Sequence, residues 1–152
     1  MAPTPTSSVR PPRWIKSLNR LLLAIRAVGG LQELPVLLVA GRRSGKTRRT
    51  PLTVVTLDGH RYLLEGFPGA DWARNVRAAG GSADLVTGRV TQPVQLTELD
   101  AESAVPVLRA WPDKSGTDGP KIMMNAGVVD EISPDAFAAL AGRCAVFRLD
   151  DR

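Results

Sequence analysis

The stretch PVLLVAGRRSGKTRRTPLTVVTL, residues 35–57, decides the fold. Two runs rich in aliphatic and β-branched residues, 35–40 and 51–57, predict buried strands. Between them lies a loop of glycine, serine, threonine and cationic residues, 41–50. The pair Asp58-Gly59 then predicts a tight hairpin turn into a third strand at 61–64. Strands joined by short turns indicate antiparallel pairing.

The remaining elements alternate strands with a few helices. A helix is predicted at 70–79, closed by Gly80-Gly81, and others begin at caps, from Asp100 towards Trp111 with a kink at Pro106, and from Ser133 to Gly142. Further strands are predicted at 83–86, 90–96 and 144–149. Because hairpins outnumber strand-helix-strand units, the pattern predicts an α+β fold, an antiparallel sheet or barrel with flanking helices.

The N-terminal third differs from the rest in composition. Residues 1–12 are rich in Pro, Ser and Thr and predict a disordered tail. Residues 13–29 predict an amphipathic basic helix that ends at two glycines, followed by one domain over 30–150. Packing of this helix on its own domain is favoured, and peripheral contact of residues 13–28 with an anionic membrane stays open. No run is long enough to span a bilayer. The single cysteine of the sequence favours the reducing cytoplasm, with attachment to the inner face of the membrane as the alternative.

The charge of the 152-residue chain is strongly localised. Residues 1–49 carry ten basic residues and one acidic residue, a net charge of +9, whereas 50–152 carry ten basic and fourteen acidic residues, a net charge of −4. A concentrated positive field favours a phosphate-bearing, polycarboxylate or membrane partner. The single cysteine, Cys144, and the single histidine, His60, exclude a disulfide framework and a Cys/His metal cluster, so no metal site is predicted.

The loop invites comparison with a phosphate loop. Residues 40–47 match its relaxed pattern after a strand, but Pro51 and β-branched residues follow where a helix is required. A P-loop NTPase is therefore only a remote alternative. Arginine and lysine at this density, with two hydroxyl side chains, instead predict binding of phosphate or carboxylate groups. The residues concerned are Arg42, Arg43, Ser44, Lys46, Thr47, Arg48 and Arg49.

This loop, the segment 71–81 (DWARNVRAAGG) and the ending 146–149 (VFRL) together resemble the nitroreductase-type deazaflavin-dependent oxidoreductases of actinobacteria. The resemblance covers residues 30–150. It implies a split β-barrel of the FMN-binding type that binds coenzyme F420, a 5-deazaflavin with a phosphate and an oligoglutamate tail. It also implies hydride transfer to a quinone, a nitroaromatic compound or another small unsaturated acceptor. FMN is the alternative cofactor, and a homodimer stays open.

Carried over residue by residue, the resemblance implies a cofactor site in three parts. The loop residues given above would contact the phosphate and the tail carboxylates, and Thr50, Pro51 and Leu52 would lie near the ring system. The backbone of Glu65, Gly66, Phe67, Gly69 and Ala70 would pass along the deazaflavin, with Trp72 and Asn75 supporting the pocket.

Such a cofactor supplies the hydride itself, so no catalytic residue is assigned to the chain, and no Ser-His-Asp or paired-carboxylate arrangement is evident. A non-catalytic protein that binds F420, FMN or another anionic ligand is the alternative in a different class. A nucleic-acid partner is disfavoured, because the cations gather in one loop and one helix with few aromatic residues for stacking.

Overall fold

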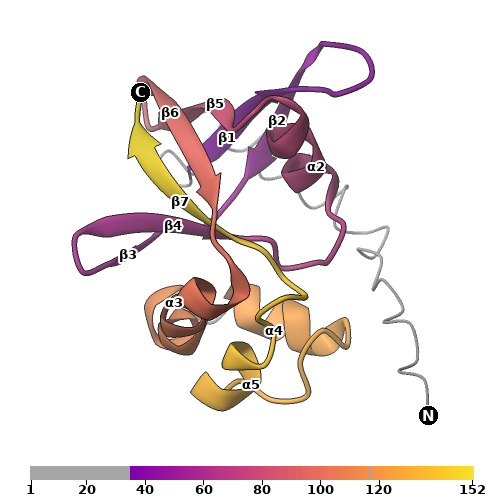
Figure 1. Cartoon of the computed structure of the whole chain (residues 1–152), viewed down its shortest axis with the longest axis vertical. Helices are drawn as coiled ribbons and strands as arrows, with labels where there is room; N and C mark the ends of the chain where they lie inside the picture. Colours follow the sequence, from indigo (N-terminus) through magenta and orange to yellow (C-terminus); the bar gives the residue numbers. More distant parts are fainter. Residues whose placement is uncertain (1–34, 117) are drawn as a thin grey trace.

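The structure is a computed structural model that describes residues 35–116 and 118–152. The predicted tail 1–12 and helix 13–29 lie outside these residues. The strands are β1 (Val36–Ala40), β2 (Thr47–Pro51), β3 (Val55–Leu57), β4 (His60–Leu64), β5 (Ser82–Thr87), β6 (Val90–Glu98) and β7 (Val146–Asp151). The helices are α2 (Asp71–Ala78), α3 (Ala101–Lys114), α4 (Asp118–Asn125) and α5 (Pro134–Ala138) (Figure 1).

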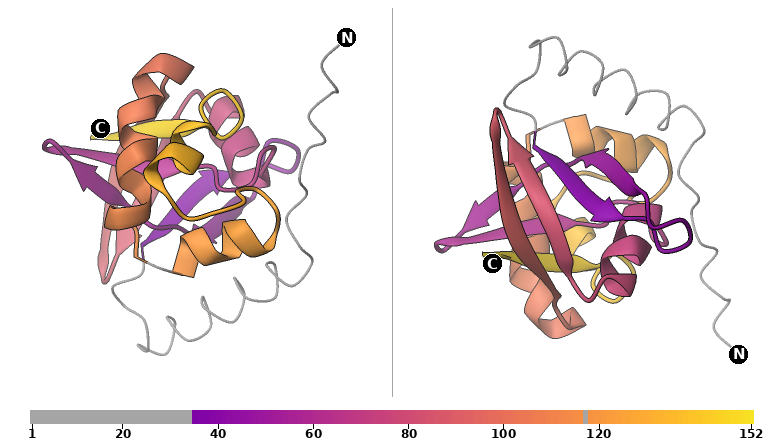
Figure 2. Two further views of the ribbon diagram at one scale, coloured as in Figure 1. Left: turned by 90° about the horizontal axis from the view of Figure 1, so that it is seen from below. Right: turned by 90° about the horizontal axis from the view of Figure 1, so that it is seen from above.

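All seven strands form one sheet in the order β2-β1-β5-β6-β7-β4-β3. Every neighbouring pair is antiparallel. The sheet twists strongly and curls into a half-barrel, with α2 beside β1 and β2, and with α3, α4 and α5 gathered at the other end (Figures 1 and 2). The predicted α+β class, with an antiparallel sheet and flanking helices, is confirmed.

The core consists of two clusters that share the central strands. Leu63 and Phe147 point into a first cluster with Trp72, whereas their neighbours Leu64 and Val146 point into a second. This division follows from the alternation of side chains along a strand. The rings of Trp72 and Phe147 lie 5.6 Å apart and tilted by 56°, so α2 is fixed to β7. The second cluster packs α3, α4 and α5 against the sheet.

The cationic segment is more extended than the sequence predicted. Residues 47–51 form β2, which pairs with the whole of β1, from Ala40 opposite Thr47 to Val36 opposite Pro51. The single strand predicted at 51–57 is therefore wrong, since β2 ends at Pro51 and β3 begins at Val55. The hydrogen-bonded pairing of β1 with β2 extends into the polar segment, so Arg48 and Arg49 lie within a strand. A position at the sheet edge suits them, because charged side chains protect an edge from pairing with other chains.

Two helical predictions need correction, and one helix was missed. α4 was not predicted, and burial of Pro120 and Met123 is what fixes this weakly patterned segment. α3 extends three residues beyond Trp111, to Lys114, and spans both Pro106 and Pro112. α5 ends at Ala138, well before Gly142.

The predicted caps and the hairpin turn are confirmed. The side chain of Asp100 accepts a hydrogen bond from the Ser103 N–H at 2.7 Å, and Ser133 Oγ accepts one from the Ala136 N–H at 3.1 Å. Asp58 and Gly59 have φ of 51° and 80°, which closes a two-residue turn between β3 and β4. At Gly81 a Cβ would lie 2.2 Å from the Leu96 carbonyl oxygen, so only glycine fits where α2 returns to the sheet. In the part of the chain that the structure covers, every helix is too short or too polar to cross a bilayer.

Candidate functional site

The turn between β1 and β2 is fixed by its own backbone. Gly41 N–H donates to the Lys46 carbonyl oxygen at 2.8 Å, and Gly45 N–H donates to the Gly41 carbonyl oxygen at 2.9 Å. Ser44 Oγ accepts a further hydrogen bond from the Lys46 N–H at 3.2 Å. This turn and the start of β2, residues 42–49, are called the cationic hairpin end. It projects from the sheet next to α2 (Figures 1 and 2).

Arg42 attaches the cationic hairpin end to α2. Asn75, of which 5% is exposed, accepts hydrogen bonds at Oδ1 from the Arg42 backbone N–H at 3.1 Å and from Arg42 Nη1 at 2.9 Å. Arg42 Nη2 also lies 3.3 Å from Asp71 Oδ1. The structure therefore brings together two of the three sequence segments that carry the family resemblance, the loop and residues 71–81. It also gives Arg42 an anchoring role within the protein.

The other cations of the cationic hairpin end are available to a ligand. Arg43, Lys46, Arg48 and Arg49 are exposed, and none forms an ion pair with a carboxylate of residues 35–116 or 118–152. Within the same residues the backbone N–H groups of Arg43 and Ser44 have no hydrogen-bond acceptor. Guanidinium and ammonium groups beside unpaired N–H groups are the kinds of donor that bind phosphate and carboxylate in proteins.

The phosphate-loop alternative does not survive the structure. Lys46 is followed directly by β2, so the turn does not lead into a helix as a phosphate loop must. Residues 40–47 therefore match the residue spacing of a phosphate loop without its structure.

The remaining predicted residues fall on both sides of the sheet. Ala70 and Trp72 belong to the first core cluster and Leu52 packs against it, whereas Phe67 packs against the second. Gly66 lies close to Met123, and Gly69 adopts a φ of 83° just before α2. Thr50 and Pro51 are half-buried at the end of β2. The structure thus joins Arg42 to Asn75 directly, and places Leu52, Ala70 and Trp72 together.

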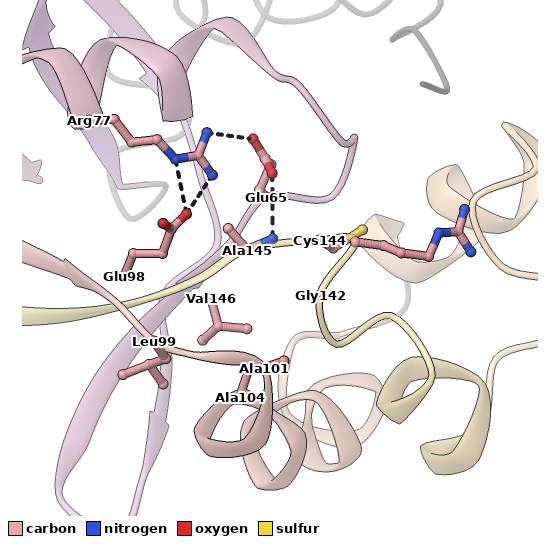
Figure 3. A pocket seen from close by; sticks show the side chains of 11 residues that line it. Glu65, Arg77, Glu98, Leu99, Ala101, Ala104, Gly142, Cys144, Ala145 and Val146 are labelled. Carbon is pink, nitrogen blue, oxygen red and sulfur yellow. Dashed lines mark hydrogen bonds and ion pairs between the residues drawn. The ribbon is translucent and has the colours of Figure 1, made fainter. Parts of the chain in front are cut away.

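The side chain of Glu65 lies in a cavity that the sequence did not predict (Figure 3). Glu65 is 3% exposed, and its Oε1 accepts a hydrogen bond from the Ala145 N–H at 3.4 Å. Its Oε2 lies 3.7 Å from Arg77 Nη1. Arg77 Nε and Nη2 donate to Glu98 Oε1 at 2.9 and 2.5 Å. The cavity has a volume of about 250 Å³, and Cys144 also lines it.

Burial governs the acid–base properties of this cavity. It raises the pKa of the Glu65 carboxyl above 4.5, against the opposing effects of Arg77 and of the N–H groups of Ala145 and Gly69, and Glu98 adds to the rise. Burial, reinforced by the charge of Glu65, raises the pKa of the Cys144 thiol to about 12, so this thiol is neutral at physiological pH. The hydrogen bond to Glu98 raises the pKa of Arg77.

No sequence signal marks this group of residues. Four different elements or loops contribute its members, at sequence spacings that match no catalytic or metal-binding pattern. These members are Glu65, Arg77, Glu98 and Cys144. Among the residues that the structure describes, no three His, Cys, Asp or Glu side chains cluster as metal ligands would.

Comparison with known proteins supports the fold. No family model and no curated protein matches the chain. A pyridoxamine 5'-phosphate oxidase-related, FMN-binding protein from Nostoc punctiforme has a solved structure that superposes with a TM-score of 0.54 at 12% identity, over 94% of this chain and 82% of that one. This likeness confirms the predicted split-barrel fold.

Two further solved structures have lower TM-scores. An F420-H2 dependent reductase, FDR-A, has a TM-score of 0.46 and 21% identity over 78% of this chain and 94% of that one. A chain described as a domain-swapped dimer has a TM-score of 0.48 and 20% identity over 93% of this chain and 100% of that one.

Proposed function

We propose that the chain is a deazaflavin-dependent oxidoreductase whose cationic hairpin end binds the phosphate and the tail carboxylates of coenzyme F420. The observation that carries this proposal is the set of four exposed cations without a carboxylate partner in the described chain, on a turn held to α2 by Asn75. Charge-assisted hydrogen bonds from arginine to phosphate or carboxylate are among the stronger polar contacts in proteins.

In this proposal some residues would contact the cofactor and others would hold the turn in place. Arg43, Lys46, Arg48 and Arg49 would contact the anionic groups of the cofactor, and Arg42 would keep the turn in place through Asn75 and Asp71. The family resemblance adds Thr50–Leu52 and residues 65–70 beside the ring system. The bound cofactor would supply the hydride, and the chain would position the ring against a quinone, a nitroaromatic compound or another unsaturated acceptor.

FMN is the second candidate, because the superposable Nostoc protein is described as FMN-binding. FMN carries a single phosphate, whereas F420 adds a chain of carboxylates. Four available cations between residues 43 and 49 provide more positive charge than one phosphate neutralises. The density of cations therefore favours F420.

The test is a fluorescence titration of the purified protein with F420 and, separately, with FMN. Each charge-assisted contact contributes about 1.5–3 kcal/mol, so Arg43→Ala/Lys46→Ala should weaken F420 binding at least tenfold at moderate salt. Arg89→Ala/Lys121→Ala removes the same charge from two exposed positions elsewhere and should leave the affinity close to wild type. Unchanged F420 affinity in the hairpin variant would rule out this site.

Turnover distinguishes an enzyme from a binding protein. With reduced F420, the wild type should accelerate reduction of a quinone or nitroaromatic acceptor, and ATP with Mg²⁺ should not be hydrolysed. Tight F420 binding without reduction of any acceptor would favour the non-catalytic alternative.

A further inference from the structure

The Glu65 cavity is a candidate binding site separate from the cationic hairpin end. Its walls come from α2, the end of β6, the first turns of α3 and the segment 142–146 (Figure 3). Glu65 is the only residue that it shares with the predicted cofactor residues.

The cavity contains an ion pair whose facing atoms, Glu65 Oε2 and Arg77 Nη1, lie too far apart for a hydrogen bond. Glu65 Oε2 is buried and accepts no hydrogen bond among the described residues. Arg77 Nη1 forms an ion pair with this oxygen at 3.7 Å, while Nε and Nη2 donate to Glu98. The guanidinium also lies over the Phe147 ring, with Cζ 5.7 Å from the ring centroid, so its position is fixed. Buried polar atoms normally have a hydrogen-bond partner, and Glu65 Oε2 lacks one among the described residues.

The charges that line the cavity favour a neutral ligand. Glu65 and Glu98 balance Arg77 and Arg143, and the Cys144 thiol is uncharged. An ammonium group would suit Glu65 Oε2 but would face the Arg77 guanidinium. A carboxylate would suit Arg77 but would face Glu65. A primary carboxamide avoids both conflicts, because it presents an N–H donor beside a carbonyl acceptor.

The walls set the size of the ligand body. Ala101, Ala104 and Gly142 leave space, and Leu99 and Val146 provide apolar surface. A cavity of about 150 Å³ is known to accommodate benzene. The roughly 250 Å³ available here therefore suits a single ring that carries one polar group.

We propose that this cavity binds a small neutral primary carboxamide, which donates N–H to Glu65 Oε2 and accepts from Arg77 Nη1 through its carbonyl oxygen. The ligand body would lie against Leu99 and Val146.

Three probes of equal size test the proposal: benzamide, benzoate and benzylamine. Each is titrated into isotope-labelled full-length protein while the amide NMR signals of Leu99 and Ala145 are followed. Benzamide should bind saturably, and at least tenfold more tightly than the anion or the cation. Glu65→Gln puts an NH₂ donor against Arg77 and should weaken benzamide at least tenfold. Ala101→Leu, at an exposed position of the wall, should block it by filling space, whereas Glu102→Gln should bind as wild type does.

The proposal fails if no probe shifts these signals, which would mean that the cavity holds only water. It also fails if benzylamine or benzoate binds as tightly as benzamide, or if Glu65→Gln leaves benzamide binding intact. Should Glu65→Gln not fold, as its amide spectrum would reveal, Ala101→Leu decides alone: full benzamide affinity in that variant overturns the proposal.

Discussion

At the cationic hairpin end, four of the five cations face solvent and have no carboxylate partner in the described chain, whereas at the Glu65 cavity one arginine contacts two carboxylates. In the first region the charge is available to a ligand and contributes little to folding. In the second region the charge is partly buried and holds α2, β6 and the end of β4 together. The same residue type, arginine, is therefore unpaired and exposed at one place and paired within the fold at the other.

The burial of the Glu65 cavity should be detectable through the reactivity of the Cys144 thiol. The thiol is 1% exposed and its pKa is raised to about 12, so very little thiolate exists at pH 8. A bulky disulfide reagent should modify native protein at least a hundredfold more slowly than protein unfolded in denaturant. The measurement is the rate of thiol release at pH 8. A labelling rate of native protein within tenfold of the rate for unfolded protein would show that the reagent reaches Cys144 in the folded state.

Replacing one arginine in each region compares them directly. Arg77→Ala leaves Glu65 buried without its cation, and Arg77 is 41% exposed, so we expect a loss of about 2 kcal/mol in the free energy of unfolding. Arg43→Ala removes an exposed side chain and should change this free energy by less than about 0.5 kcal/mol. Urea denaturation of both variants measures the difference. Equal losses would contradict the division of roles.

The two regions also differ in how far the sequence predicts them. The cationic hairpin end is local, since its cations lie within eight consecutive residues between strand patterns, and its attachment to Asn75 matches a resemblance that pairs the two segments. The Glu65 cavity depends on side chains brought together by the curl of the sheet, which no linear spacing encodes. The backbone of Glu65 was predicted to lie near a cofactor, and nothing in the sequence indicates that its side chain is buried beside Arg77.

The fold shows the same limit. Alternating apolar residues and turn pairs such as Asp58-Gly59 predicted most strands and the antiparallel class. The extent of β2 depends on its partner β1, because Thr47-Arg48-Arg49-Thr50 has no apolar alternation of its own. Likewise α4 depends on tertiary burial of Met123. The sequence therefore mispredicts the elements whose extent or position depends on contacts with a neighbouring element.

Asn75 is the point at which the exposed region depends on a buried group. Asn75→Ala would leave the Arg42 backbone N–H and Nη1 without their acceptor, at an expected cost of about 1.5 kcal/mol in the free energy of unfolding. The Arg42 N–H should then exchange with solvent at least tenfold faster, as hydrogen-exchange NMR would show. Asn125→Ala, at the exposed end of α4, is the matched control and should change neither quantity. An unchanged exchange rate at Arg42 would mean that the turn alone holds the cationic hairpin end.

The smallest expected effect is the pH dependence that Glu65 gives to stability, since Arg77 and two N–H groups offset part of the effect of burial. Because burial holds the folded-state pKa above the usual 4.5, the folded state binds this proton more tightly than the unfolded chain does. The contribution is complete below pH 4.5 and is lost as the pH rises through the raised pKa. The free energy of unfolding of the wild type, minus that of Glu65→Gln, should therefore fall with rising pH in this window. Urea denaturation at closely spaced pH values gives this difference. A difference that rises with pH would show that the effect of Arg77 on the pKa of Glu65 outweighs that of burial. Glu65 would then form a stabilising ion pair.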